Sequence, residues 1–291
     1  ITYNLTQSPG AHDREPAWSP NGKYVAWISD MDGEDQIYVM ENVQGAKPDK
    51  ITKNTTYIFN FDWSPDSKKI AWRDQNYKLN VVDLESRKIN EIIHSPHGHI
   101  WSYNWSPDSK WLAFSEPQAN DMGIIQLYNI EQNKKYSVTQ DWYDADAPAF
   151  SPCGKYLYFT SARDFSPTYN DVEWNFAYKD MNKIYLVGLS KDAPLPFSPK
   201  NDMVSTEEEK KSDESEKPED KILKVDFDGL ADRVGVLPVE AGYYWNLQPT
   251  DDKLFFATMK SNDNSSELKF YNLKENKIEP VGENLSITLS T

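Results

Sequence analysis

A short pattern of hydrophobic and polar positions recurs along the chain. Residues 63–72 show it clearly: an aromatic residue, Ser-Pro, two small polar residues, a lysine and then an apolar run. Near-copies of this pattern occupy 18–27, 105–114 and 150–159. A fifth copy, which matches the pattern less closely, occupies 248–257. The four clear copies place proline at 20, 65, 107 and 152, in steps of 45, 42 and 45 residues. A fixed period of this size indicates a repeat architecture.

Each copy predicts a β-hairpin. The aromatic anchor ends one strand. The chain leaves the sheet at Ser-Pro, because proline has no N–H to donate to the hydrogen bonds between strands. Asn-Gly, Asp-Ser or Cys-Gly then forms the turn, and a run such as Tyr24 to Trp27 returns as the second strand. Later apolar runs, such as Gln36 to Met40 and Lys50 to Thr52, supply a third and a fourth strand.

Four antiparallel strands within one period predict a propeller blade. We therefore expect an all-β fold, a β-propeller with about five blades. Unrelated hairpins are the alternative, and the matching order and spacing of the copies disfavour them. We expect one partial propeller over 1–291, with blades near 14–53, 54–96, 97–140, 141–240 and 241–284.

The sequence at both ends of the chain indicates that the propeller is truncated there. Residues 1–13 look like the closing strand of a preceding blade, because Tyr3 to Thr6 is similar to Lys50 to Lys53. Residues 285–291 start another blade, since Thr291 follows Pro249 by 42 positions. We expect the chain to be a piece of a longer protein.

The fourth repeat predicts two inserts, at 163–181 and 194–220. The first is rich in aromatic residues, and we expect it to cover a propeller face or an interface with another domain. The second contains the acidic stretch 207–220, which has no aromatic or β-branched residue and is expected to form a mobile surface loop.

The repeat anchors Trp18, Trp63, Trp105 and Phe150 are predicted to be core residues. Large rings suit blade-to-blade packing because each buries a large apolar area. We expect all four to be buried between adjacent blades.

The formal net charge of −15 argues against binding nucleic acid through its phosphates. No apolar run approaches the roughly 18 residues that crossing a membrane requires. Cys153 is the only cysteine, so internal disulfides are excluded. The charge also favours neutral or basic ligands over acidic ones.

No catalytic motif is found in the sequence, and we predict no catalytic, metal or cofactor-binding residue. Nucleophile elbows, zinc-protease motifs and phosphate loops are absent. His94, His97 and His99 can be read as metal ligands, but a polar loop between blades is favoured because no second ligand group completes the set. Asp141, Asp144 and Asp146 lie near the start of an innermost strand, and paired carboxylates there could do acid/base work, but we do not predict a catalytic role for them.

The residues that open the innermost strands are candidates for the rim of an axial channel. They are Arg14, Asn60, Tyr103, Asp146 and Tyr244.

Over nearly its whole length the chain resembles the second, seven-bladed propeller of tricorn-type serine proteases, with TolB-like repeats. The resemblance rests on segments near 4–10, 16–20, 28–34, 147–159, 184–186, 194–197, 226–230 and 237–239. It implies that about five of seven blades are present.

The resemblance also implies a function. In this family non-catalytic propellers gate oligopeptides toward a chamber formed by C-terminal catalytic and PDZ-like domains. Expected partners are oligopeptides, the remaining blades and those domains, with a homo-oligomer as a further expectation. A cytoplasmic location is implied, with the periplasm as alternative. A free-standing TolB-like interaction propeller and the propeller of a prolyl-oligopeptidase-type enzyme remain alternative functions.

Deleting residues 207–220 is expected to leave the melting temperature nearly unchanged. Shortening a surface loop changes its closure entropy only slightly. Thermal unfolding followed by circular dichroism checks this, and a melting temperature lowered by many degrees would contradict it.

Overall fold

The computed structural model describes residues 5–6, 8–165, 167–169, 176–193, 195–196, 223–259 and 265–283. This part of the chain divides into two compact units, one up to Asp146 and one from Ala147. Within the described residues the only helix is the four-residue 3-10 turn η1 (Leu230–Arg233). No helix there has the length and hydropathy that crossing a membrane would require.

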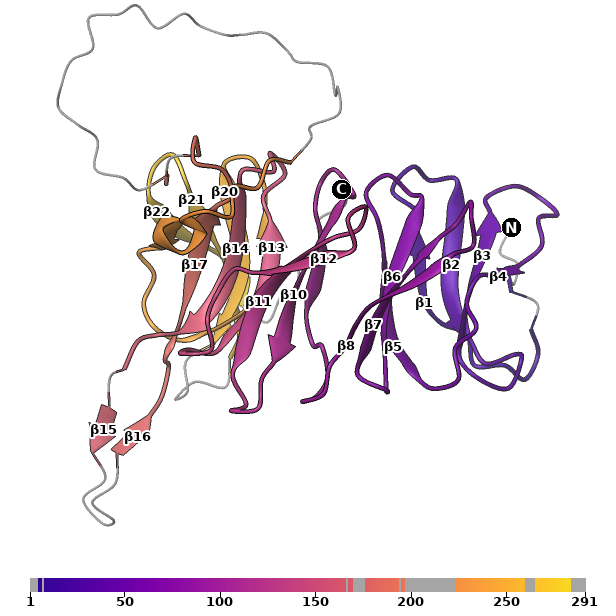
Figure 1. The fold of residues 1–291 in the computed structure, drawn as a ribbon, viewed down its shortest axis with the longest axis horizontal. Coiled ribbons are helices and arrows are strands. Elements are labelled where there is room, and N and C mark those ends of the chain that lie inside the picture. Colours follow the sequence, from indigo (N-terminus) through magenta and orange to yellow (C-terminus); the bar gives the residue numbers. More distant parts are fainter. Residues whose placement is uncertain are drawn as a thin grey trace, which may run out of the picture. The chain divides into compact units, whose positions relative to one another are not determined.

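The first unit contains three four-stranded antiparallel sheets with strands in chain order, drawn in indigo to magenta in Figure 1. The first sheet comprises β1 (Arg14–Trp18), β2 (Tyr24–Ser29), β3 (Gln36–Glu41) and β4 (Asp49–Lys50). The second comprises β5 (Ile58–Trp63), β6 (Lys69–Asp74), β7 (Lys78–Asp83) and β8 (Ile89–His94). The third comprises β9 (Tyr103–Trp105), β10 (Trp111–Pro117), β11 (Gly123–Asn129) and β12 (Lys134–Ser137).

The second unit repeats the arrangement, and β13 runs into it from the first unit. Its first sheet comprises β13 (Ala145–Phe150), β14 (Tyr156–Ala162), β17 (Asn182–Gly188) and β18 (Val234–Val236). Its second comprises β19 (Tyr243–Pro249), β20 (Lys253–Met259), β21 (Glu267–Asn272) and β22 (Lys277–Glu283). The prediction of an all-β fold with four-stranded antiparallel blades is confirmed.

Burial along the strands shows how the sheets are used. The two middle strands of the third blade, β10 and β11, are buried at nearly every position. A strand covered on both faces has such a continuous pattern. Apolar clusters join neighbouring blades: Ile28 and Ile37 of the first blade pack with Trp63 and Ile70 of the second. Adjacent blades within each unit therefore share their core.

The Ser-Pro turns are built by side-chain hydrogen bonds. The hydroxyl of Ser64 accepts the amide of Lys69 at 2.9 Å and donates to Asp66 at 2.6 Å. The Ser19, Ser106 and Ser151 hydroxyls likewise accept the amide five residues later. The repeated serine and its polar partner two positions on are therefore the turn's own framework.

The same turns connect one blade to the next. The amide of Asn21 donates to the Ser67 hydroxyl at 3.1 Å, and the amide of Asp66 donates to the Ser109 hydroxyl at 2.9 Å. Both serines have φ near +60°, which costs a residue with a side chain about 1–2 kcal/mol. The serine hydroxyl offsets that cost because it accepts a hydrogen bond from a backbone amide of the neighbouring blade. A glycine at the same turn position has no side chain to accept this bond.

Three of the four anchors are buried as predicted, with exposed fractions of 8% for Trp63, 6% for Trp105 and 5% for Phe150. The Nε1 atoms of Trp63 and Trp105 donate to the preceding blade, to the carbonyls of Ala17 at 3.2 Å and Asp62 at 3.3 Å. The prediction for Trp18 is wrong: it is 59% exposed. An anchor is covered by the blade before it, and Trp18 belongs to the first described blade.

The insert 163–181 contains a small two-stranded sheet of its own, β15 (Pro167–Tyr169) and β16 (Phe176–Tyr178). Figure 1 shows it as a narrow hairpin in the connection between β14 and β17. Phe165 and Tyr178 stack edge-on at its base, with ring centroids 6.1 Å apart, and both are more than half exposed. Its covering role stays a prediction.

Residues 5–6 and 8–13, the described part of the predicted closing strand 1–13, contain no strand. Residues 285–291, nearly all of 194–220 and the whole acidic stretch 207–220 lie outside the described residues.

Replacing a buried anchor should cost far more stability than replacing Trp18. Trp63→Ala is expected to lower the free energy of unfolding by about 3–5 kcal/mol, because it leaves a cavity between blades. Trp18→Ala is expected to change it by at most about 0.5 kcal/mol, as for most surface substitutions. Urea unfolding of both variants checks this, and equal losses would contradict the interpretation of the anchors.

Candidate functional site

The two ends of each blade differ in what they expose. We call the end where a blade's first strand begins the leading end, and the opposite end, which carries the Ser-Pro turn, the turn end. In the first unit, the exposed aromatic residues of the leading end are Tyr57, Tyr77, Trp101, Trp142 and Tyr143, whereas Trp18 lies at the turn end. Exposed rings in one place mark interaction surfaces more often than scattered single ones do.

Three of these rings, Tyr57, Tyr77 and Trp101, join the less exposed Phe59 and His99 in one continuous set of edge-on and tilted ring contacts, which we call the aromatic array. Tyr57 contacts Phe59 with centroids 5.3 Å apart, and His99 lies 5.0 Å from Phe59, 4.4 Å from Tyr77 and 5.0 Å from Trp101. Its residues come from the loops into β5 and β9, from β5 itself and from the β6–β7 turn. The array thus spans the leading ends of two blades.

Two guanidinium groups lie against the array. Arg14 stands 4.4 Å from the Tyr57 ring, and Arg73 lies 4.9 Å from Phe59 and 5.1 Å from Trp101. These distances are those of cation–π contacts. The array therefore already binds cations of this protein.

Arg14, predicted to lie at a channel rim, also ties the first blade to the second. It forms an ion pair with Asp35 and donates to the carbonyl of Ile58 at 2.8 Å. Asp35 in turn accepts the amide of Ile58 at 2.9 Å. Both charged side chains are only 12% exposed, so this pair is a largely buried link between blades.

Asn60 and Tyr103, two further rim candidates, lie beneath the array. The side-chain amide oxygen of Asn60 accepts a hydrogen bond from Nε of Arg73 at 2.7 Å. This bond orients the Arg73 guanidinium between the Phe59 and Trp101 rings. The Tyr103 hydroxyl donates to the carbonyl of Ala71 at 3.3 Å, and burial raises the pKa of Tyr103 well above its usual value. The structure thus brings both predicted residues to Arg73, which the sequence did not single out.

Asp62 lies next to this group. Burial raises its pKa to about 6, against the opposing effects of the Tyr103 hydroxyl and the positive charge of Arg73. By accessible surface Asp62 is an exposed residue, although many atoms surround it, so contact with water makes the upward shift of its pKa smaller than burial alone would give.

Asp144 and Asp146 join the loop into β13 to the third blade. Asp144 accepts the amide of Gly123 at 2.7 Å, and Asp146 accepts the hydroxyl of Ser102. A Cβ on Gly123 would meet the Ser115 hydroxyl at 2.5 Å and the Ala145 carbonyl at 2.7 Å, so only glycine permits this close approach.

A pocket of about 320 Å³ opens between these residues and the aromatic array. We call it the Trp101 pocket, and its lining consists of His97, Gly98, His99, Trp101, Ser115, Pro117, Asp121, Gly123, Asp144 and Asp146. Burial and the charge of Arg73 lower the pKa of His99, so this imidazole is neutral at neutral pH. The lining therefore combines an exposed indole with three carboxylates.

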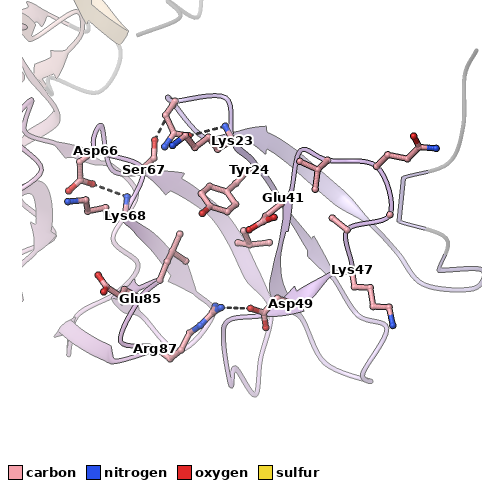
Figure 2. Close-up of a pocket in the computed structure, with 17 residues that line it drawn as sticks. Lys23, Tyr24, Glu41, Lys47, Asp49, Asp66, Ser67, Lys68, Glu85 and Arg87 are labelled. Carbon is pink, nitrogen blue, oxygen red and sulfur yellow. Dashed lines mark hydrogen bonds and ion pairs between the residues drawn. The ribbon is translucent and has the colours of Figure 1, made fainter.

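A larger hollow of about 750 Å³ lies at the turn ends of the first two blades (Figure 2). Its charges balance, with Lys23, Lys47, Lys68 and Arg87 against Glu41, Asp49, Asp66 and Glu85. Arg87 pairs with Asp49 across the two blades, and Asp66 accepts the amide of Lys68 at 3.0 Å. The Arg87–Asp49 ion pair therefore links the two blades, and the Asp66 bond holds its own turn.

The fifth rim candidate, Tyr244, lies in the second unit. Its hydroxyl donates to the carbonyl of Glu240, its ring meets Phe256 with centroids 5.5 Å apart, and burial raises its pKa to about 12. The channel-rim role of all five candidates stays a prediction.

Comparison with known proteins identifies the family. The family model of the tricorn protease second β-propeller domain matches residues 1–291. The chain belongs to this family.

Relatives and solved structures agree with this assignment. The chain is 26% identical to tricorn protease homolog 1 of Streptomyces coelicolor over 96% of its length, and 25% identical to a tricorn protease homolog of Saccharolobus solfataricus over 98%. It spans only about a quarter of these relatives, 28% and 25% of their lengths. The crystal structure of the tricorn protease has a similar fold, with a TM-score of 0.78 and 21% identity over 94% of this chain and 27% of the other.

In the part of this tricorn-type propeller that the structure describes, no three His, Cys, Asp or Glu side chains could together hold a metal ion. His99, one of the three clustered histidines, serves instead as the centre of the aromatic array. The arrangement is suited to binding.

The protein should lose stability between about pH 4 and pH 6 through Asp62. A carboxyl whose pKa is raised on folding favours the folded state while protonated, so that its contribution is present below the unfolded value of 3.8 and is lost as the pH passes about 6.

Urea unfolding at several pH values checks this with Asp62→Asn as the comparison. The wild type should lose stability relative to the variant across this window, with a constant difference above it. Parallel pH profiles would rule out the assignment to Asp62.

Proposed function

We propose that this chain is a non-catalytic propeller domain of a tricorn-like serine protease, which gates or docks oligopeptides on their way to a catalytic chamber formed by other domains. One observation supports it most directly: the exposed aromatic array at the leading ends of the blades, beside the loops into the innermost strands. Family membership supplies the parent activity.

The chemistry of the array suits peptides. Aromatic faces bind apolar and proline side chains by burial and cations by their π electrons. Exposed rings held in place by contacts with neighbouring rings lose little conformational entropy on binding. An array of this kind binds many sequences weakly, as a gate for mixed oligopeptides must.

A free-standing interaction propeller of the TolB type is the second candidate. A crystal structure of TolB from Acinetobacter baumannii shares the fold, with a TM-score of 0.51 and 14% identity over 92% of this chain and 53% of the other. A hydrolase domain in the same parent protein favours the protease function, and its absence favours the TolB-like function.

The test is an oligopeptide hydrolysis assay on this chain beside the full-length protein, together with peptide binding. We expect hydrolysis by the full-length protein, none by this chain, and binding by both. Hydrolysis by the chain that a serine-directed inhibitor abolishes would overturn the non-catalytic assignment.

A double variant tests the array itself. Tyr57→Ser with Tyr77→Ser should weaken peptide binding about two- to tenfold, because each exposed ring contributes contact area. Trp18→Ala, at the turn end, is the matched control and should leave binding unchanged. Equal losses in both proteins would contradict the assigned surface.

A further inference from the structure

Another pocket opens at the leading end, beside the aromatic array. It has a volume of about 270 Å³, and we call it the Asn80 pocket. The link 53–55 from the first blade lines it together with Trp72, Asp74, Asn76, Lys78, Asn80, Ile89 and Glu91 of the second. This link continues to Tyr57, whose carbonyl accepts the amide of Gln75 in the β6–β7 turn at 2.9 Å. A peptide docked on the rings of Tyr57 and Tyr77 therefore passes the pocket.

The base of the pocket consists of polar side chains that are almost fully buried. Trp72 is 2% exposed, Asp74 4% and Asn80 6%. Nε1 of Trp72 is buried without a hydrogen-bond partner. Among the described residues the Asn80 side chain makes a single hydrogen bond, a long one of 3.3 Å from Nδ2 to Asp74. Buried polar groups that lack partners cost free energy, so this base favours a ligand that supplies them.

The third blade fills the same positions with its own side chains. Glu116 lies 42 residues after Asp74, and Gln126 takes the place of Asn80 in the strand pairing. Nε2 of Gln126 donates to the Glu116 carboxylate at 2.8 Å, and the Gln126 oxygen accepts the Ser137 hydroxyl at 3.1 Å. This fold therefore already stabilises a carboxamide placed between a buried carboxylate and a donor.

The second blade leaves room for a ligand because its side chains are shorter. Asp74 and Asn80 each have one methylene group fewer than their counterparts. Ile89 stands where the third blade has Lys135, whose ammonium group pairs with Glu116 at 2.6 Å. The volume of the pocket is below the roughly 300–1,000 Å³ of pockets for drug-sized molecules, so it accepts one side chain and not a whole oligopeptide.

The charges of the lining favour a neutral group. Lys53 and Lys78 balance Asp74 and Glu91, and Lys78 pairs with Glu91 at 2.8 Å. Burial raises the pKa of Asp74, and an anionic ligand beside it would add to the cost of its charge. A carboxamide carries two N–H donors and a carbonyl acceptor without a net charge. It therefore matches both the donors and the acceptors of the pocket.

We propose that the Asn80 pocket binds the carboxamide of a glutamine side chain in a docked oligopeptide. The NH2 group of the ligand donates to the Asp74 carboxylate and to the side-chain oxygen of Asn80. The oxygen of the ligand accepts from Lys78 and faces the indole N–H of Trp72. This rests on the proposed peptide-docking function and adds its specificity, while the peptide backbone crosses the adjoining part of the aromatic array.

Four fluorescent peptides of one acetylated parent sequence test the proposal by anisotropy. They differ only at the central residue, which is glutamine, glutamate, norleucine or lysine, four side chains of similar length. We expect the glutamine peptide to bind about 3- to 30-fold more tightly than the other three, the effect of one or two net hydrogen bonds in a buried site.

Two variants assign the preference to the pocket. Asn80→Leu removes the amide at nearly constant size. Ile89→Trp fills the pocket from strand β8, where Ile89 is 38% exposed and an aromatic residue suits a strand. Both should lower the affinity for the glutamine peptide to that for the norleucine peptide. Ile89→Val is the matched control and should keep the preference, and thermal unfolding checks that each variant is folded.

The outcomes separate the carboxamide site from peptide docking. Equal binding of the four peptides, tighter binding of the glutamate or lysine peptide, or a glutamine preference that Ile89→Trp keeps overturns the carboxamide site and leaves docking in place. Absence of binding by any peptide overturns both.

Discussion

The fold depends on each blade supplying hydrogen-bond acceptors and apolar surface to the blade that follows it. The indole of Trp63 reaches the carbonyl of Ala17, and that of Trp105 reaches the carbonyl of Asp62. A sheet of four strands cannot bury both of its faces alone, so its middle strands are stable only between neighbours. Trp18 shows the same dependence. No blade is described before the blade of Trp18, and its ring is 59% exposed.

The two ends of a blade differ in how their polar groups are satisfied. At the turn end, hydroxyl groups and backbone amides are satisfied within the repeat or by the next turn, as in Ser64 and Ser67. The leading end has no such repeated framework, so its loops vary in sequence and present rings and charges. A constant structural end and a variable end are what a repeat protein needs in order to bind ligands without changing its core.

The electrostatics of the leading end follow from this packing. Cations of the protein, Arg14 and Arg73, are placed on ring faces, while carboxylates such as Asp144 are fixed by backbone amides. Three carboxylates, those of Asp121, Asp144 and Asp146, line one pocket beside the array.

The sequence by itself determined the repeat, the four-stranded blades and the burial of Trp63, Trp105 and Phe150, because these follow from local turn chemistry and a fixed period. It also pointed to Asn60, Tyr103 and Asp146 as residues at the start of innermost strands. It did not find Arg73, His99 or Trp101 as one site, since they lie in different blades and meet only when the blades pack. Only the tertiary structure brings Arg73, His99 and Trp101 together and leaves Trp18 outside the core. Both results depend on which blade packs against which.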